Sequence, residues 1–138
     1  MRRTANRGGQ TGSMLLEALL AILVFSIGIL GLVRMHAVSI THVSNAKYRT
    51  EASFLANRVI AEMWSNHNNL PAYAYAGGAA PSVLAKWMAE VQGSLPGAAA
   101  NPPLITLGAG NQVTVTVYWQ PPNAVTLHNY IVVAYINS

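Results

Sequence analysis

The side-chain carboxylates of this 138-residue chain belong to four glutamates, because aspartate is missing. These are Glu17, Glu51, Glu62 and Glu90. Cysteine is missing as well. The sequence therefore excludes Ser-His-Asp triads, Asp-rich calcium loops, thiolate chemistry and disulfides. The glycine-containing turn at residues 108–110 has no following lysine and does not match a phosphate-binding loop.

Four histidines are the remaining candidates for metal binding or acid–base chemistry: His36, His42, His67 and His128. His36 and His42 are six residues apart, whereas a helical metal-binding pair stands at i and i+4. No carboxylate or second histidine lies at ligand spacing from any of them. We therefore expect no metal site, no cofactor and no catalytic residue.

Glu17 is the one charged residue in an apolar segment from Gly12 to Val33, GSMLLEALLAILVFSIGILGLV. As a helix with a rise of ~1.5 Å per residue, this segment would extend for about 30 Å, close to the thickness of a bilayer core. A charge within that layer costs on the order of 2.5–3.5 kcal/mol. The helix macrodipole offsets only roughly 0.3–1 kcal/mol of this cost. Glu17 therefore needs a partner of opposite charge.

The surface of the folded chain must be poor in charge. Hydrophobic residues make up 52% of the chain and charged residues 9%, against roughly 25% charged residues in an ordinary soluble domain. The formal net charge is +4, and Arg2, Arg3 and Arg7 contribute three of the positive charges. We assign the basic excess to a short N-terminal arm on the cytoplasmic side of a membrane, and nucleic acid is not indicated.

Two ordinary interpretations of the first 33 residues are a secretory signal peptide and a plain membrane anchor. A signal peptide has small residues at a cleavage site after its apolar run, but residues 34–38 read RMHAV. A plain anchor leaves Glu17 without an explanation.

The stretch GSMLLE at residues 12–17, followed by uncharged residues up to Val33, resembles the class III signal of type IV prepilins. The resemblance implies that prepilin peptidase removes residues 1–12 by cutting between Gly12 and Ser13, and that the new amine of Ser13 is N-methylated. The family commonly has phenylalanine where this chain has Ser13. The resemblance also gives Glu17 a role in assembly, as the charge partner of the terminal amine of an adjacent subunit.

One long helix is expected over residues 13–66, because no proline or turn cluster interrupts them. Residues 13–33 would be its transmembrane and assembly segment. Further along, apolar residues recur at helical spacing up to Met63, and Arg58 and Glu62 form an i,i+4 pair. Gly28 and Gly31 would permit close helix packing or, alternatively, local flexibility.

Residues 67–138 are expected to form a globular head with an αβ connecting region and an antiparallel sheet. A short helix is predicted over residues 81–92, with Leu84, Trp87, Met88 and Val91 as its core stripe. Tyr73 and Tyr75, in a flexible stretch before it, are the better candidates for surface contacts.

Three strands are predicted, over residues 103–107, 112–120 and 130–136. The second strand alternates, with Val113, Val115, Val117 and Trp119 on the face that is expected to be buried. The third strand, YIVVAYI, is apolar on both faces and suits a central strand or one that packs on both sides.

The predicted α+β fold, a long N-terminal helix whose C-terminal half packs on a small antiparallel sheet, resembles the type IV pilin fold. The apolar segment and the VTVTVYWQ strand look most like the PilV-type minor pilins, also called type IV pilus modification proteins. The resemblance implies a structural subunit of a pilus initiation or tip complex, which supports adhesion or motility. It implies as partners other major and minor pilins, prepilin peptidase, the inner-membrane assembly machinery and, before assembly, membrane lipid.

The same resemblance implies a single-pass protein of the bacterial inner membrane, with its head in the periplasm, that later enters a pilus or pseudopilus. A pseudopilin of a type II secretion system would share these residues. An uncleaved, membrane-anchored binding module is the alternative from another class, and it would tolerate an apolar residue at position 17.

Overall fold

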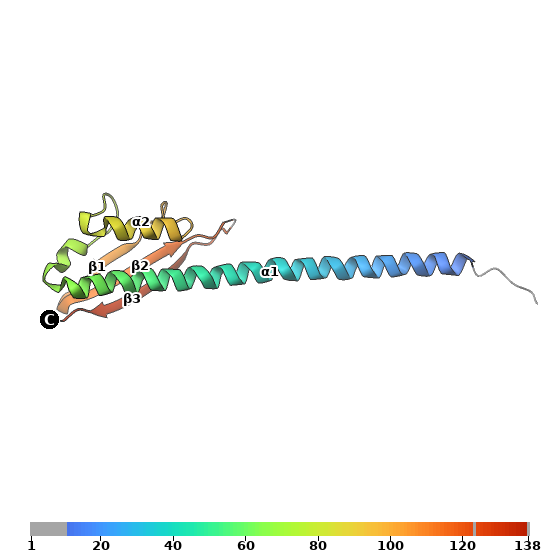
Figure 1. Cartoon of the computed structure of the whole chain (residues 1–138), viewed down its shortest axis with the longest axis horizontal. Helices are drawn as coiled ribbons and strands as arrows, with labels where there is room; N and C mark the ends of the chain where they lie inside the picture. Colours follow the sequence, from blue (N-terminus) through green and yellow to red (C-terminus); the bar gives the residue numbers. More distant parts are fainter. Residues whose placement is uncertain (1–10, 123, 138) are drawn as a thin grey trace, which may run out of the picture. The chain divides into compact units, whose positions relative to one another are not determined.

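A computed structural model describes residues 11–122 and 124–137, which form an α+β structure (Figure 1). The chain divides into two compact units, of which the first ends at Thr41 and the second begins at His42. Helix α1, Thr11–Ser65, contributes residues to both units. The expected leader lies outside the described residues except for its last two.

The described part of the first unit is the N-terminal portion of α1. No proline interrupts this portion, and residues 12–40 are all exposed. The uncharged run therefore forms a regular helix but has no core of its own within its unit. It contains a window of mean hydropathy 2.6, none of which is buried.

The second unit begins with the remainder of α1, which ends at Ser65 where turn-forming residues begin, as predicted. A 3₁₀ turn, η1, follows at His67–Tyr73. The short helix expected over residues 81–92 starts later and in two parts, the 3₁₀ turn η2 (Ser82–Leu84) and the helix α2 (Ala85–Ser94). The later start has a physical reason, since the backbone of Pro81 is extended, with ψ of 147°.

The sheet of the second unit has three antiparallel strands in the order β1-β2-β3. They are β1 (Leu104–Leu107), β2 (Gln112–Trp119) and β3 (His128–Tyr135). The tight connection from β1 to β2 is the 3₁₀ turn η3, Ala109–Asn111. Gly110 and Asn111 have φ of 68° and 55° there, the left-handed region that glycine and asparagine adopt most readily.

The core of the second unit lies between one face of the sheet and the helices α1 and α2 (Figure 1). The alternation predicted for β2 is confirmed, because Val113, Val115, Val117 and Trp119 are all buried. The predicted stripe of α2 is confirmed too: Leu84, Trp87, Met88 and Val91 are buried. The stripe of α1 is Ala52, Leu55, Ala56, Val59, Ile60 and Met63. The indole Nε1–H of Trp87 donates to the Leu55 carbonyl at 2.9 Å and joins the two helices.

The prediction that the third strand is central or packs on both sides is wrong, since β3 pairs with β2 alone, stands at the edge of the described sheet and has one exposed face. Its side chains alternate, and Ile131, Val133 and Tyr135 are exposed on the face away from the core. One apolar face of β3 is therefore covered by the core, and the other is not covered by any described residue.

The prediction that Tyr73 and Tyr75 make surface contacts is also wrong, because only 4% and 7% of them is exposed. The Tyr75 backbone forms an antiparallel bridge with Ile105, with N–H···O distances of 2.9 and 2.8 Å. This bridge extends the sheet at β1 and fixes Tyr75 beside the core, and Tyr73 is buried at the end of η1.

Replacing Leu55 by alanine should lower the free energy of unfolding of the second unit by about 2–5 kcal/mol, because it leaves a cavity in the core. Phe54→Ala is the matched control, since Phe54 is 61% exposed and Leu55 only 2%. Its effect should stay within about 0.5 kcal/mol. Urea unfolding of the full chain in a neutral detergent, followed by tryptophan fluorescence, measures both. Equal losses would contradict the assignment of this helix face to the core.

Candidate functional site

The apolar segment of α1, residues 12–33, carries a single ionisable side chain among its described residues, that of Glu17. Glu17 is exposed, as are Met14, Leu15 and Leu20 around it. No ion pair joins Glu17 to any residue in the described part of the chain. The carboxylate that the sequence singles out therefore still requires a partner from outside these residues.

The remaining polar group in the middle of this segment, the Ser26 hydroxyl, is satisfied within the helix. It donates to the Ile22 carbonyl at 2.7 Å. Serine commonly makes this bond in apolar helices, where it hides the donor from the surroundings. The outer surface of the segment is therefore apolar apart from Glu17 and the residues at its start.

Gly28 and Gly31 leave open space on the segment. A Cβ atom added at either position would meet nothing within 4 Å. The structure thus gives neither glycine a packing partner among the described residues. A close approach at these positions would have to come from a second helix.

By length and composition, α1 is the one described helix that could cross a membrane. A signal sequence would pass the same test.

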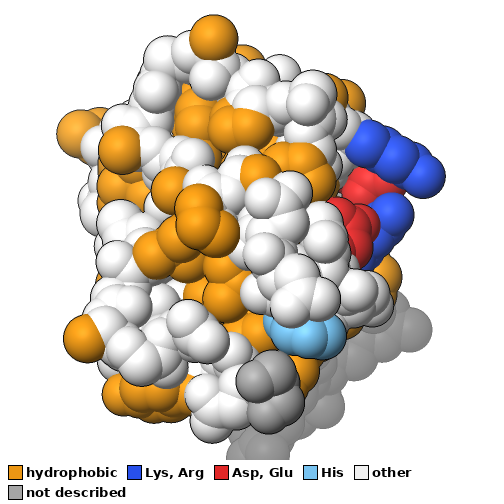
Figure 2. Space-filling view, turned by 90° about the vertical axis from the view of Figure 1, so that its left-hand side faces the viewer, with side chains coloured by type: hydrophobic (Ala, Val, Ile, Leu, Met, Phe, Trp, Pro, Cys, Tyr) orange, Lys and Arg blue, Asp and Glu red, His pale blue; other side chains and the backbone are white. Residues whose placement is uncertain are grey.

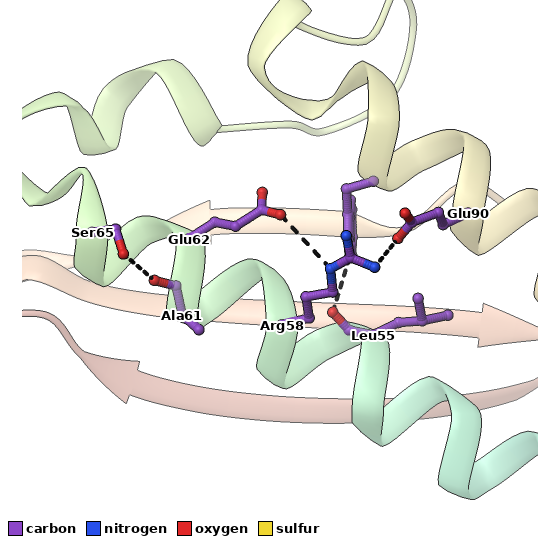
Figure 3. A network of polar contacts seen from close by, with 7 residues as sticks. Leu55, Arg58, Ala61, Glu62, Ser65 and Glu90 are labelled. Atoms are coloured by element: carbon purple, nitrogen blue, oxygen red, sulfur yellow. Dashed lines mark hydrogen bonds and ion pairs between the residues drawn. The ribbon is translucent and has the colours of Figure 1, made fainter.

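In the second unit, Arg58 of α1 contacts two carboxylates, that of Glu62 on the same helix and that of Glu90 on α2 (Figure 3). Its Nε lies 3.9 Å from Glu62 Oε1, as the i,i+4 spacing predicted, and its Nη1 donates to Glu90 Oε2 at 2.5 Å. The pairing with Glu90, 32 residues away, has no signal in the sequence. One guanidinium is shared by two carboxylates, and between 31% and 41% of each side chain is exposed, so the network acts as a surface clamp between the helices.

The outer face of β3 is an apolar surface on the second unit. It consists of Ile131, Val133 and Tyr135, and the Tyr135 hydroxyl accepts a hydrogen bond from Gln112 Nε2 at 2.8 Å. No charged side chain occurs in β3. Figure 2 shows a comparable scarcity of charge on the face that it presents, where the charged side chains gather at one edge.

The histidines do not converge. His36 and His42 are exposed on α1, and the His67 ring nitrogen lies 3.4 Å from the Trp64 carbonyl. His128 stacks on Trp119, with ring centroids 5.6 Å apart. Within the described residues, no three His, Cys, Asp or Glu side chains are grouped so that they could hold a metal ion.

Comparisons of the chain with protein-family models, with curated proteins and with solved structures find no match.

Replacing Glu90 by glutamine should cost at most about 1 kcal/mol of unfolding free energy, because the pair with Arg58 is partly exposed and screened by solvent. The loss should shrink in about 0.5 M salt, where the Debye length is only a few ångströms. Glu51→Gln, at a carboxylate without an ion pair among the described residues, is the control and should show no such salt dependence. A loss above about 2 kcal/mol that salt leaves unchanged would show that the Arg58 clamp is a buried pair instead.

Proposed function

We propose that this chain is a type IV pilin-like structural subunit, most like a PilV-type minor pilin, that assembles with other pilin subunits. The observation that carries the proposal is the fully exposed apolar helical segment whose single carboxylate, Glu17, stands four residues after Ser13. Such a segment buries nothing within its own unit. It needs lipid before assembly and neighbouring helices afterwards.

Cleavage between Gly12 and Ser13 would explain the position of Glu17. The new N-terminus is a cationic amine at the start of a helix that has an apolar surface. In a bundle of such helices, the amine of one subunit and Glu17 of the next neutralise each other. Each charge alone is costly in an apolar surrounding, and the pair is tolerable.

The glycines support the same packing of helices. Gly28 and Gly31 leave their positions open, so a neighbouring helix backbone can approach closely there. The apolar outer face of β3 offers a second surface, on the head, that a neighbouring subunit would cover. The basic arm with Arg2, Arg3 and Arg7 fits retention on the cytoplasmic side, with the head in the periplasm.

The processing of the chain is the first test. We expect the protein, expressed in a bacterium that has a prepilin peptidase, to begin at Ser13, with or without one added methyl group on its amine. Gly12→Val should leave the precursor uncut, and Gly9→Val, in the same arm, should be cut normally. Intact mass and N-terminal sequencing of the membrane fraction give the answer. A wild-type chain that still begins near Met1 would make this an uncleaved anchor and overturn the proposal.

Replacing Glu17 by leucine should leave membrane insertion intact but remove the subunit from filaments. Loss of one partner of a buried ion pair costs about 3–5 kcal/mol, so incorporation should fall by more than about 100-fold. Immunoblots of sheared filaments and of the inner membrane measure the two pools.

Ser26→Ala is the control for this experiment, because it changes a side chain of the same segment whose hydroxyl is bonded within the helix. It should enter filaments at the wild-type level. Normal amounts of the Glu17→Leu variant in filaments would refute the assembly role of Glu17 even where cleavage occurs as expected.

A further inference from the structure

The face of the sheet that points away from the core, here called the outer sheet face, is an even surface of uncharged side chains. Two rows of side chains cross its three strands, Leu104–Thr116–Ile131 and Thr106–Thr114–Val133. All of them except Leu104 are β-branched, and such side chains pack well on a pleated surface. Ile131 and Val133 are 55% and 49% exposed. The face therefore offers apolar surface in an ordered array across the sheet.

The charged side chains of the second unit all lie on its helices. They are Lys47, Arg49, Glu51, Arg58 and Glu62 on α1, and Lys86 and Glu90 on α2. Glu90 is the last charged residue of the sequence, so the three strands contain none. A charged surface repels a copy of itself, whereas this face can meet a second copy without any like-charge contact. Its hydroxyl groups are also self-complementary, because each of them can donate and accept.

The direction of the strands decides how two anchored copies can meet. β3 runs broadly in the same direction as the part of α1 that packs on the sheet (Figure 1). Two chains anchored in one membrane enter their second units from the same side, so this part of α1 points the same way in both. Antiparallel pairing of two β3 edges would reverse one of them. Packing of two outer sheet faces keeps both directions, because the two-fold axis then runs along the strands.

We propose that two copies of this chain pack outer sheet face against outer sheet face while both are anchored in one membrane. The inference rests on the proposed function for the anchoring of the apolar segment, and it names a second copy as the neighbour that covers β3. With the axis over the central strand β2, Thr116 faces Thr116 of the second copy. In the same row, the exposed Ile131 then packs on Leu104 of the second copy.

The size of the face makes this pairing weak in solution. At ~3.4 Å per residue and ~4.8 Å between strands, it covers roughly 400 Å² per copy. The pair then buries about 800 Å², less than the roughly 1,200–2,000 Å² of a stable interface. Anchoring in a membrane fixes the orientation of both copies and removes part of the entropy that association costs. We therefore expect pairs in a bilayer and monomers in dilute detergent.

Fluorescence energy transfer between donor- and acceptor-labelled full chains in phosphatidylcholine liposomes measures the pairing. The chain has no cysteine, so Ala89→Cys, at an exposed position of α2, gives a single labelling site. Transfer should exceed the level of random encounters at the same surface density. It should fall when unlabelled chain without the cysteine is added, and it should be absent in dilute detergent.

Thr116→Lys should lower the pairing at least tenfold, because two lysines then face each other across the axis. Thr116→Glu should do the same. A mixture of the two variants should restore the transfer, since lysine then faces glutamate, and this recovery also shows that both variants are folded. Phe54→Lys is the matched control, because it places a lysine at an exposed position of α1, away from the sheet. It should pair like the wild type.

Three results would overturn the pairing: no transfer between wild-type chains in liposomes, transfer that survives in Thr116→Lys alone, and a mixture of the two variants that does not recover. The second result would assign the association to the apolar segment instead. The uncut Gly12→Val precursor should pair like the processed chain, because the outer sheet face is the same in both. A chain that is processed and inserted but does not pair refutes this inference and leaves the proposed function standing. A chain that pairs but is never cut refutes the proposed function alone.

Discussion

The need to cover an apolar helix that carries one charge is the constraint on which the rest of this molecule depends. Residues 12–40 of α1 are exposed, and within residues 12–33 Glu17 is the sole ionisable side chain. The hydrophobic effect requires that such a surface be covered, and an isolated carboxylate on it requires a counter-charge. Neither requirement is met by the described residues. In the proposed function, both would be met by similar helices of neighbouring subunits packed side by side, provided that each contributes a cation at its own N-terminus. The proposed cleavage before Ser13 would create that cation.

The second unit depends on the same helix in a different way. From Ala52 onward, α1 gives one face to the core and leaves the other to solvent, so the sheet has no folded core without it. A unit of this size buries only a modest amount of surface and has no disulfide to compensate. Specific links between α1 and α2 add to the packing. The Trp87 bond to Leu55 is buried, whereas the Arg58 clamp is largely a surface feature.

The elements that the sequence predicts correctly are those whose signal is local. Alternation marks the buried face of β2, turn-forming residues mark the end of α1, and helical spacing marks Leu84, Trp87, Met88 and Val91. The errors concern pairings between distant parts of the chain. Tyr75 is buried because it bridges to Ile105, and a tyrosine in a glycine- and alanine-rich stretch carries no sign of this. For the candidate site, Glu17 stands out from the sequence alone, but the Arg58–Glu90 pair depends on a tertiary contact.

The error in the prediction for β3 is of a different kind, and it bears on function. A strand that is apolar on both faces is expected to be buried on both. The sequence does not show whether the atoms that cover it belong to the same chain. Here one face is covered by the core and the other, with Ile131, Val133 and Tyr135, is left exposed on an edge strand without charges. Soluble monomers usually protect such edges with lysine or proline, because a bare edge pairs with other chains. The apolar part of α1 carries the same kind of signal, namely hydrophobic surface in excess of what its own chain can bury. Lipid could cover the apolar helix of an anchored domain, but it does not account for the bare outer face of β3, and this second surface is the one that favours the proposed filament subunit over a solitary anchored domain.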